Sequence, residues 1–233
     1  MANDGKLHVT PKFMDTREAM QAILNGKEHP ALWSPSGSRW ATALADAWTK
    51  THAGEPNPIR ANDSESYRTY LRTPLVFLTT RDKAASLGKA LVADSRSSWA
   101  ALHELRIHPL PGKATRFSHP DPRSSSVGFA TLGMFLADYA RIAKNTDVSK
   151  AANDLGFVGY LADMKSYSVS DPSFRGDATV LCNAFAENRL VADMVVVSKS
   201  DALATCAKHP ELAVLYPSPT TAADQSVAVL EAK

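Results

Sequence analysis

The sequence TPLVFLTT, at residues 73–80, is the stretch that decides the fold class. Four consecutive apolar residues, bounded by threonines and a proline, are typical of a strand that is buried on both faces in a parallel sheet. A helical pattern follows at once from Arg81 to Leu91. We therefore expect a buried strand that leads directly into a helix, which is the repeating unit of α/β proteins.

Strands and helices are expected to alternate along the rest of the chain. The other predicted strands are 7–13, 31–33, 115–119, 191–197, 212–216 and 226–230. The other predicted helices are 16–24, 38–51, 97–105, 125–143, 148–164, 177–188 and 201–208. Such alternation is typical of mostly parallel sheets with flanking helices, so the predicted fold class is α/β.

The composition of the chain excludes several classes of function. Its 233 residues are 44% hydrophobic and 21% charged, which fits one large domain or two small lobes. A net charge of +2, with acids and bases mixed, does not favour nucleic acid as a partner. No apolar run approaches the roughly 20 residues that cross a bilayer, and residues 1–6 lack the apolar core of a signal peptide.

Hydroxyl-rich turns are the candidate ligand site. The turns WSPSGS (33–38) and SHPDPRSSS (118–126) each lead from a short apolar run into a helix, and YPSPT (216–220) follows a predicted strand. A helix N-terminus attracts anions, because its free N–H groups and the positive end of its dipole converge there. Ligands of α/β sheets bind beyond the C-terminal ends of the strands, where these turns fall.

Two sets of three serines are the candidate donors to a carboxylate or other anion, through hydroxyl and backbone N–H groups. They are Ser34, Ser36 and Ser38 in the first turn, and Ser124, Ser125 and Ser126 in the second. The alternative is that both sets only cap helices and form turns, where serine is common. The second set precedes an unusually long apolar helix, which favours ligand contact there.

Other candidate residues lie beside these turns. Arg123 could pair with a carboxylate through two hydrogen bonds, or could be a solvated surface residue. Trp33 could stack on a ligand, whereas Trp40 fits the core face of its helix better. Tyr216 could form the rim of the site or pack beside its neighbouring proline. His119 is a hydrogen-bonding residue of its turn more readily than a metal ligand.

The sequence lacks catalytic, metal and cofactor motifs. Ser36-Gly37-Ser38 is not a G-x-S-x-G nucleophile turn, and neither G-x-G-x-x-G, a phosphate-binding GxxxxGK nor HExxH occurs. Seven scattered histidines show no metal-ligand spacing. Cys182 and Cys206 are either two helical thiols or a disulfide. We expect no catalysis, no metal and no cofactor; a serine hydrolase with Ser36 or Ser38 as nucleophile stays the second alternative.

Several of these segments together resemble a known family. MDTREAM (14–20) and ALWSPS (31–36) resemble the first lobe of type 2 solute-binding proteins, more narrowly those associated with von Willebrand factor A domains. Thr73 to Phe77 resembles the strand that crosses into the second lobe, and Ser118 to Gly128 the ligand-facing turn and helix of that lobe. Val214 to Pro217 with Ser226 to Leu230 resembles the return to the hinge.

The resemblance implies two α/β lobes that close on a small polar or anionic ligand without turnover. It implies a first lobe at 1–74, a second lobe at 75–215 and a return strand at 216–233. It also implies an extracytoplasmic location and an ABC importer, or a sensory or von Willebrand factor A partner.

The chain departs from the family in two ways. Family members begin with another strand and helix and continue past the last strand, so the first lobe is expected to be incomplete here. An open sheet edge could then serve protein–protein interaction, which is the first alternative function. Lys199 stands where the family often has an acidic residue, and a cation there favours an anionic ligand.

Overall fold

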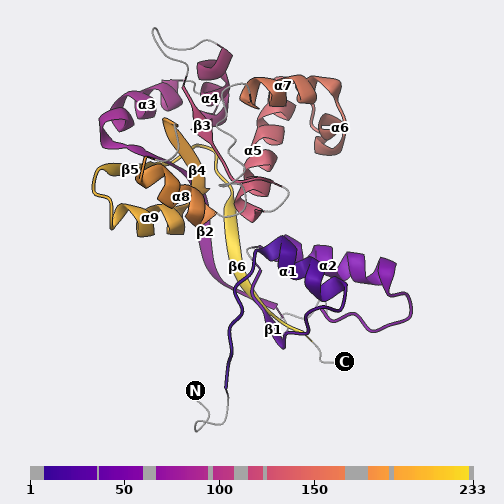
Figure 1. Cartoon of the computed structure of the whole chain (residues 1–233). Helices are drawn as coiled ribbons and strands as arrows, with labels where there is room; N and C mark the ends of the chain where they lie inside the picture. The colour runs from indigo at the N-terminus through magenta and orange to yellow at the C-terminus, as the bar shows by residue number, and fades with distance from the viewer. Residues whose placement is uncertain are drawn as a thin grey trace.

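The computed structural model describes residues 8–35, 37–59, 67–93, 97–107, 115–122, 125–165, 178–188 and 192–230. Two bodies are joined by long strands that run between them (Figure 1). The smaller body, here called the first lobe, contains α1 (Thr16–Leu24), β1 (Leu32–Trp33) and α2 (Ser38–Thr51). It also holds β6 (Ala222–Val229) and the first half of β2 (Tyr67–Thr80).

The larger body, here called the second lobe, begins with the second half of β2. Its remaining elements are α3 (Arg81–Ala93), α4 (Ser98–Ile107), β3 (Phe117–Ser118), α5 (Ser126–Ile142), α6 (Val148–Ala152), α7 (Leu155–Lys165), α8 (Ala178–Ala186), β4 (Met194–Ser198), α9 (Lys199–Cys206) and β5 (Leu212–Leu215). Among the residues described, no helix is long and apolar enough to cross a bilayer.

The strand β2 belongs to both lobes. Its residues up to Pro74 pair with β6, and from Leu75 onward the same strand pairs with β4 and β5. The buried run TPLVFLTT is therefore the point where the chain enters the second lobe. Side chains alternate across a strand, so Leu75 and Phe77 face α4 and α5, whereas Val76 and Leu78 face α8 and α9.

The prediction of mostly parallel sheets is wrong. Of the five strand pairings in the described ranges, only β3 with β4 is parallel, and the other four are antiparallel. An apolar run reports burial on both faces of a strand, not the direction of its neighbours. The predicted strand 7–13 is also wrong over its described part, because residues 8–13 pair with no strand in the described ranges.

Each lobe has its own hydrophobic core. The first-lobe core joins α1, α2 and β1 to β6 and includes Met20, Trp33, Leu44, Trp48 and Ala228. The second-lobe cores lie on the two faces of the β2–β4 sheet. Cys182 on α8 and Cys206 at the end of α9 are both thiols, in agreement with the first of the two expectations.

The pH dependence of stability is expected to reflect Asp193, just before β4. Its carboxylate accepts hydrogen bonds from Lys83 Nζ at 2.9 Å and from the Arg116 N–H at 2.8 Å. Burial alone would raise the pKa of Asp193, but the Arg116 N–H and the Lys83 ammonium lower it below its ordinary value of 3.8. Because folding lowers the pKa of Asp193, its carboxylate stabilises the folded state at pH values above the ordinary pKa of 3.8. This stabilisation is lost as the pH falls through the lower pKa of the folded state.

Asp193→Asn is therefore expected to lower the melting temperature at neutral pH and to weaken its fall in acid. Thermal unfolding from neutral pH to about pH 2 measures both effects. Asp46→Asn, at an exposed position of α2, is the control and should leave both unchanged. An acid response of Asp193→Asn equal to that of the wild type would show that this carboxylate is not coupled to folding.

Candidate functional site

The first turn of α2 lies directly after the edge strand of the first lobe. β1 ends at the buried Trp33, and α2 begins at Ser38 after the N-cap Gly37, which supplies no side-chain hydrogen bond. Ser38 is exposed, whereas Ser34 shares a hydrogen bond of 2.9 Å with the Tyr70 hydroxyl. Ser36 lies outside the described residues. The helix α2 has 14 residues, and its N-cap, Gly37, has no side chain that could accept hydrogen bonds from the backbone N–H groups of the first turn.

The first turn of α5 holds the second set of serines. The buried Ser125 is the N-cap: its hydroxyl accepts a hydrogen bond from the Gly128 N–H, and its own N–H donates to the Asp121 carbonyl at 2.8 Å. Ser126 is the first helical residue and is half-buried. Arg123 and Ser124 lie outside the described residues. A 17-residue helix thus begins at a serine cap, as the sequence predicts.

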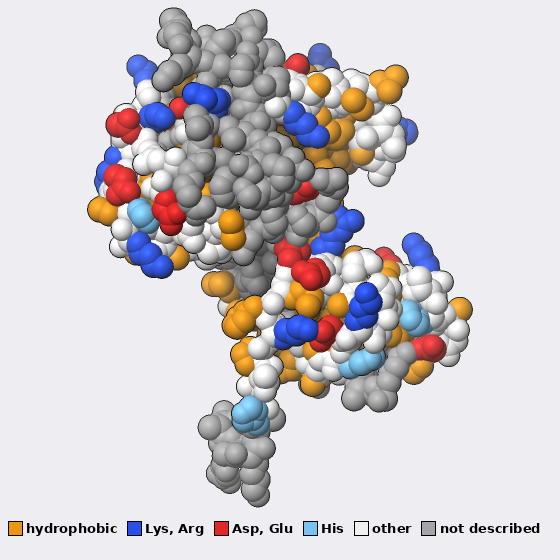
Figure 2. Space-filling view, in the orientation of Figure 1, with side chains coloured by type: hydrophobic (Ala, Val, Ile, Leu, Met, Phe, Trp, Pro, Cys, Tyr) orange, Lys and Arg blue, Asp and Glu red, His pale blue; other side chains and the backbone are white. Residues whose placement is uncertain are grey.

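The structure brings these two helix starts together. The Trp40 and Phe129 rings, from the first turns of α2 and α5, lie 5.9 Å apart between centroids. The Arg39 guanidinium lies 5.8 Å from the same Phe129 ring. The lobes therefore touch at this point. Figure 2 shows that the surface is indented between the two lobes. Ser38 and Ser126, predicted separately in two lobes, each lie within three residues of this contact.

Lys199 and Tyr216 form another group where β2 enters the second lobe. Ser198 pairs with Leu75, so α9 begins beside the crossing point of β2. Lys199 Nζ lies 5.5 Å from the centre of the Tyr216 ring, a cation–π contact. The Ser200 N–H donates to Thr73 Oγ1 at 3.1 Å, which ties the start of α9 to the crossing strand.

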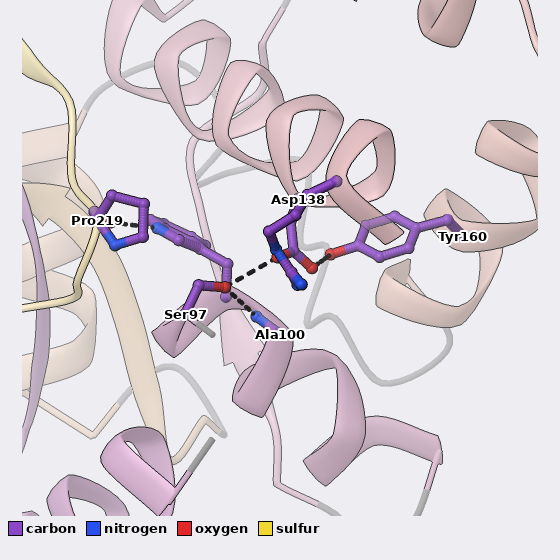
Figure 3. Close-up of polar contacts among 7 residues, drawn as sticks. Ser97, Ala100, Asp138, Tyr160 and Pro219 are labelled. Atoms are coloured by element: carbon purple, nitrogen blue, oxygen red, sulfur yellow. Dashed lines mark hydrogen bonds and ion pairs between the residues drawn. The ribbon is translucent and has the colours of Figure 1, made fainter. Parts of the chain in front are cut away.

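A buried polar network centred on Asp138 joins α5 to α4 and α7 (Figure 3). The Asp138 carboxylate of α5 accepts hydrogen bonds from the Ser97 hydroxyl at 2.8 Å, the Tyr160 hydroxyl at 3.2 Å and Arg141 Nη2 at 2.6 Å. Ser97 also caps α4, since its hydroxyl accepts from the Ala100 N–H. Burial, and next the Asp138 carboxylate, raise the pKa of Tyr160, which keeps its proton on the phenol. The network fixes α4, α5 and α7 relative to one another.

The turn of residues 216–220 is held by the same helix, α4. The Trp99 indole N–H donates to the Pro219 carbonyl at 2.8 Å, as Figure 3 shows. The Ser98 N–H donates to the Ser218 carbonyl, and the Ser218 N–H donates to the Ser98 hydroxyl. The return of the chain toward the first lobe is thus positioned by second-lobe side chains.

His119 has the environment of a structural residue. Its Nδ1 lies 2.8 Å from the Pro120 carbonyl, and its ring packs near Phe117 and Phe135. Burial lowers the pKa of His119, so the imidazole is held neutral. Among the residues described, no three His, Cys, Asp or Glu side chains come together as a metal site.

Four contributors were missed in the sequence. Arg39 and Phe129 join the two lobes, and Thr73 and Ser200 join α9 to β2. Phe129 follows the three serines closely in the sequence, but its exposure of 42% in an otherwise apolar helix could not be foreseen.

Comparison with known proteins places the chain in a family. Residues 1–233 match the family described as bacterial extracellular solute-binding protein, and the chain belongs to that family. Its members are extracellular or periplasmic binding proteins and are typically not enzymes. No curated protein matches the chain in sequence.

Solved structures share the fold at low sequence identity. The sulfate-binding protein SubI from Mycobacterium tuberculosis H37Rv is similar, with a TM-score of 0.60, 15% identity, and 94% of this chain and 63% of that protein covered. A putative spermidine/putrescine ABC transporter from Listeria monocytogenes has a TM-score of 0.60 and 12% identity, with 97% of this chain and 65% of that protein covered. The binding protein MotA from A. tumefaciens B6, in complex with glucopine, has a TM-score of 0.58 and 10% identity, with 96% of this chain and 64% of that protein covered.

These similarities establish a two-lobed binding-protein fold. The chain spans 63%, 65% and 64% of the length of these three proteins, respectively.

Proposed function

We propose that this chain binds a small polar or anionic ligand between its two lobes, without chemical turnover. The observation that carries the proposal is the contact between Trp40 and Phe129, at 5.9 Å, because it brings two serine-rich helix starts from different lobes to one place. Membership of the solute-binding family supports the same conclusion. A ligand held by both lobes favours the closed arrangement only through contacts made to each of them.

The proposed contacts follow from the chemistry of the helix starts. Ser38 from the first lobe and Ser126 from the second would donate hydroxyl and backbone N–H groups to an anion, with the positive ends of α2 and α5 directed at it. Ser36, Ser124 and Arg123 are proposed contacts of the same turns. Lys199 is proposed to add positive charge near the crossing of β2, where it stacks on Tyr216.

The proposed setting is extracytoplasmic, with an ABC importer or a sensory or von Willebrand factor A partner, as the family resemblance implies. Lobes at residues 1–74 and 75–215, with a return at 216–233, are part of the same proposal, because β2 changes partners between Pro74 and Leu75. Structurally similar proteins include binding proteins for sulfate and thiamin, a putative spermidine/putrescine transporter and a complex with glucopine, so sulfate, thiamin, polyamines and opines are suitable probes.

The experiment that tests this proposal is thermal unfolding of the protein against a panel of inorganic oxyanions, carboxylates, opines, polyamines and thiamin. A ligand that binds the folded state raises the unfolding midpoint in proportion to the logarithm of its concentration, once it is well above its Kd. We expect such a rise with an anionic or polar member of the panel. A folded protein whose midpoint responds to none of them would count against small-molecule binding.

Ser126→Asp is expected to abolish binding of an anionic ligand and to leave the fold intact. An aspartate in the first turn of a helix is favourable to the helix dipole, but its charge repels an anion that binds at the same place. Calorimetric titration with the stabilising ligand, together with the melting temperature, separates the two effects. Ser149→Asp, in the first turn of α6, is the matched control and should bind normally.

If Ser126→Asp bound an anion as the wild type does, the assigned contact would be wrong. If both serine variants lost binding equally, the loss would come from net charge and not from the site.

A further inference from the structure

The crossing strand β2 has the features of a hinge. It pairs with β6 up to Pro74 and with β4 and β5 from Leu75 onward, so it changes neighbours between two consecutive residues. Pro74 has no N–H with which to extend either ladder. A few residues that absorb a change in backbone dihedrals at such a point are enough to turn one body against another. Contacts elsewhere between the lobes therefore decide how far the lobes close.

Phe129 makes such a contact from the second lobe. Its ring lies 5.9 Å from the Trp40 ring between centroids, with 54° between the ring planes. The Arg39 guanidinium lies 5.8 Å from the centre of the same ring. Tilted aromatic pairs and cations over an aromatic face both attract. The side chains meet directly, so the attraction needs no bridging group.

Phe129 is held rigidly but is not used by the core of its own lobe. Its N–H donates to the Ser125 carbonyl at 2.9 Å, so the ring projects from the capped first turn of α5. Val127 and Ala130 on either side of it pack into the second-lobe core, whereas Phe129 is outside that core among the residues described. Trp40 packs against the first-lobe core and is fixed as well. The two surfaces are thus formed before they meet.

We propose that Phe129 is a latch between the lobes, which favours their closed arrangement before any ligand binds. Attractions of these two kinds together shift an equilibrium between open and closed arrangements by about tenfold. The latch makes Phe129 a positioning residue: it brings the helix starts at Ser38 and Ser126 together without contacting the ligand itself.

The latch has a consequence for ligand affinity, which rests on the proposed function. The apparent Kd of a ligand rises as the fraction of protein in the binding-competent arrangement falls. A protein whose lobes are held together by Phe129 therefore binds more tightly than one whose lobes are open. The closure itself is a property of the protein without ligand and can be measured alone.

The distance between the lobes in the ligand-free protein tests the latch. Spin labels at Lys50→Cys on α2 and Lys150→Cys on α6 place one exposed probe in each lobe for double electron–electron resonance. Cys206→Ser removes the partly exposed thiol, and Cys182 is buried. This labelled parent protein is expected to give mostly one short distance. Phe129→Ala should add a population at longer distance and lower the ratio of closed to open molecules about tenfold.

Two further variants are the controls for Phe129→Ala. Phe129→Tyr keeps the aromatic ring and should restore the distances of the parent protein. Leu203→Ala removes an exposed apolar side chain of similar exposure, 48% against 42%, from α9 and should leave the distances unchanged. Circular dichroism of each variant verifies folding, which an exposed position in a helix should not disturb.

Two results would overturn the proposal. One is a distance distribution of Phe129→Ala equal to that of the parent protein, because the ring would then not be what closes the lobes. The other is a parent protein found mostly at the longer distance. Failure of the latch is distinguishable from failure of ligand binding, since the distances are measured without ligand and the unfolding panel detects binding in either arrangement.

Discussion

Replacement of Gly128 by alanine is expected to lower the free energy of unfolding by about 3 kcal/mol. A Cβ at this position would lie 2.2 Å from the Pro120 carbonyl oxygen and 2.7 Å from the Asp121 carbonyl carbon. Both are backbone atoms of the turn that precedes α5, so no side chain can rotate away to make room. Because the Gly128 N–H also donates to the Ser125 hydroxyl, the start of α5 must move, and ligand affinity should fall as well.

Gly133→Ala on the same helix is the control for Gly128→Ala. A Cβ at Gly133 meets no heavy atom within 4 Å. Alanine there should raise the unfolding free energy by about 0.5–1 kcal/mol, because it reduces the backbone freedom of the unfolded chain. Urea unfolding of the two variants measures the difference. Equal effects at the two positions would contradict the close approach of α5 to its preceding turn.

Asp138→Ala is expected to lower the free energy of unfolding by about 3 kcal/mol or more. The carboxylate is almost fully buried and accepts hydrogen bonds from Ser97, Tyr160 and Arg141. Its removal leaves two hydroxyl groups in the interior without their acceptor, and the Ser97 cap of α4 loses its support. Because α4 also holds the turn at Ser218 and Pro219, protection of that turn from amide exchange should fall.

The matched control for Asp138→Ala is Asp163→Ala on α7. The Asp163 carboxylate is 51% exposed and pairs with His103 at 3.4 Å, so its loss should cost less than about 1 kcal/mol. Asp138→Asn keeps an acceptor for the Ser97 hydroxyl, so its loss of unfolding free energy should lie between those of Asp138→Ala and Asp163→Ala. A loss at Asp163 as large as that at Asp138 would show that burial does not set the cost.

Local signals in the sequence predicted much of the secondary structure. The run TPLVFLTT is buried because it pairs on both edges and packs helices on both faces, and such a site tolerates few polar residues. The helices predicted at 16–24 and 125–143 begin within one residue of the observed α1 and α5, and Asp15 and Ser125 cap these two helices through their side chains. These features depend on residues close in the chain, where propensity and capping act directly.

Strand direction and residues 8–13 were not predictable in the same way. The antiparallel pairing of β2 with β6 joins residues more than 140 positions apart, and no local pattern reports it. The alternation at 8–13 is genuine, but a strand also needs a hydrogen-bonded neighbour, and these residues pair with no strand of the described part of the chain. A period of two in the sequence describes the faces of a strand and not its neighbours.

The candidate site was predictable in its parts and not in its assembly. Serine turns before helices are visible in the sequence, but the meeting of α2 and α5 rests on Trp40 and Phe129, which are 89 positions apart. Trp40 fitted a helix core, and it does pack there at its inner side while touching Phe129. Asp138 is a lone acid within an apolar helix, which signals a buried network but does not identify its partners.

The most direct test of the central claim is a map of backbone amide chemical shifts during titration with the panel member that most raises the unfolding midpoint. Ligand binding between the lobes predicts that the largest changes fall at both helix starts together, at Ser38 and Arg39 in α2 and at Ser126 and Val127 in α5. Changes confined to one lobe, or centred away from both helix starts, would contradict the proposed site.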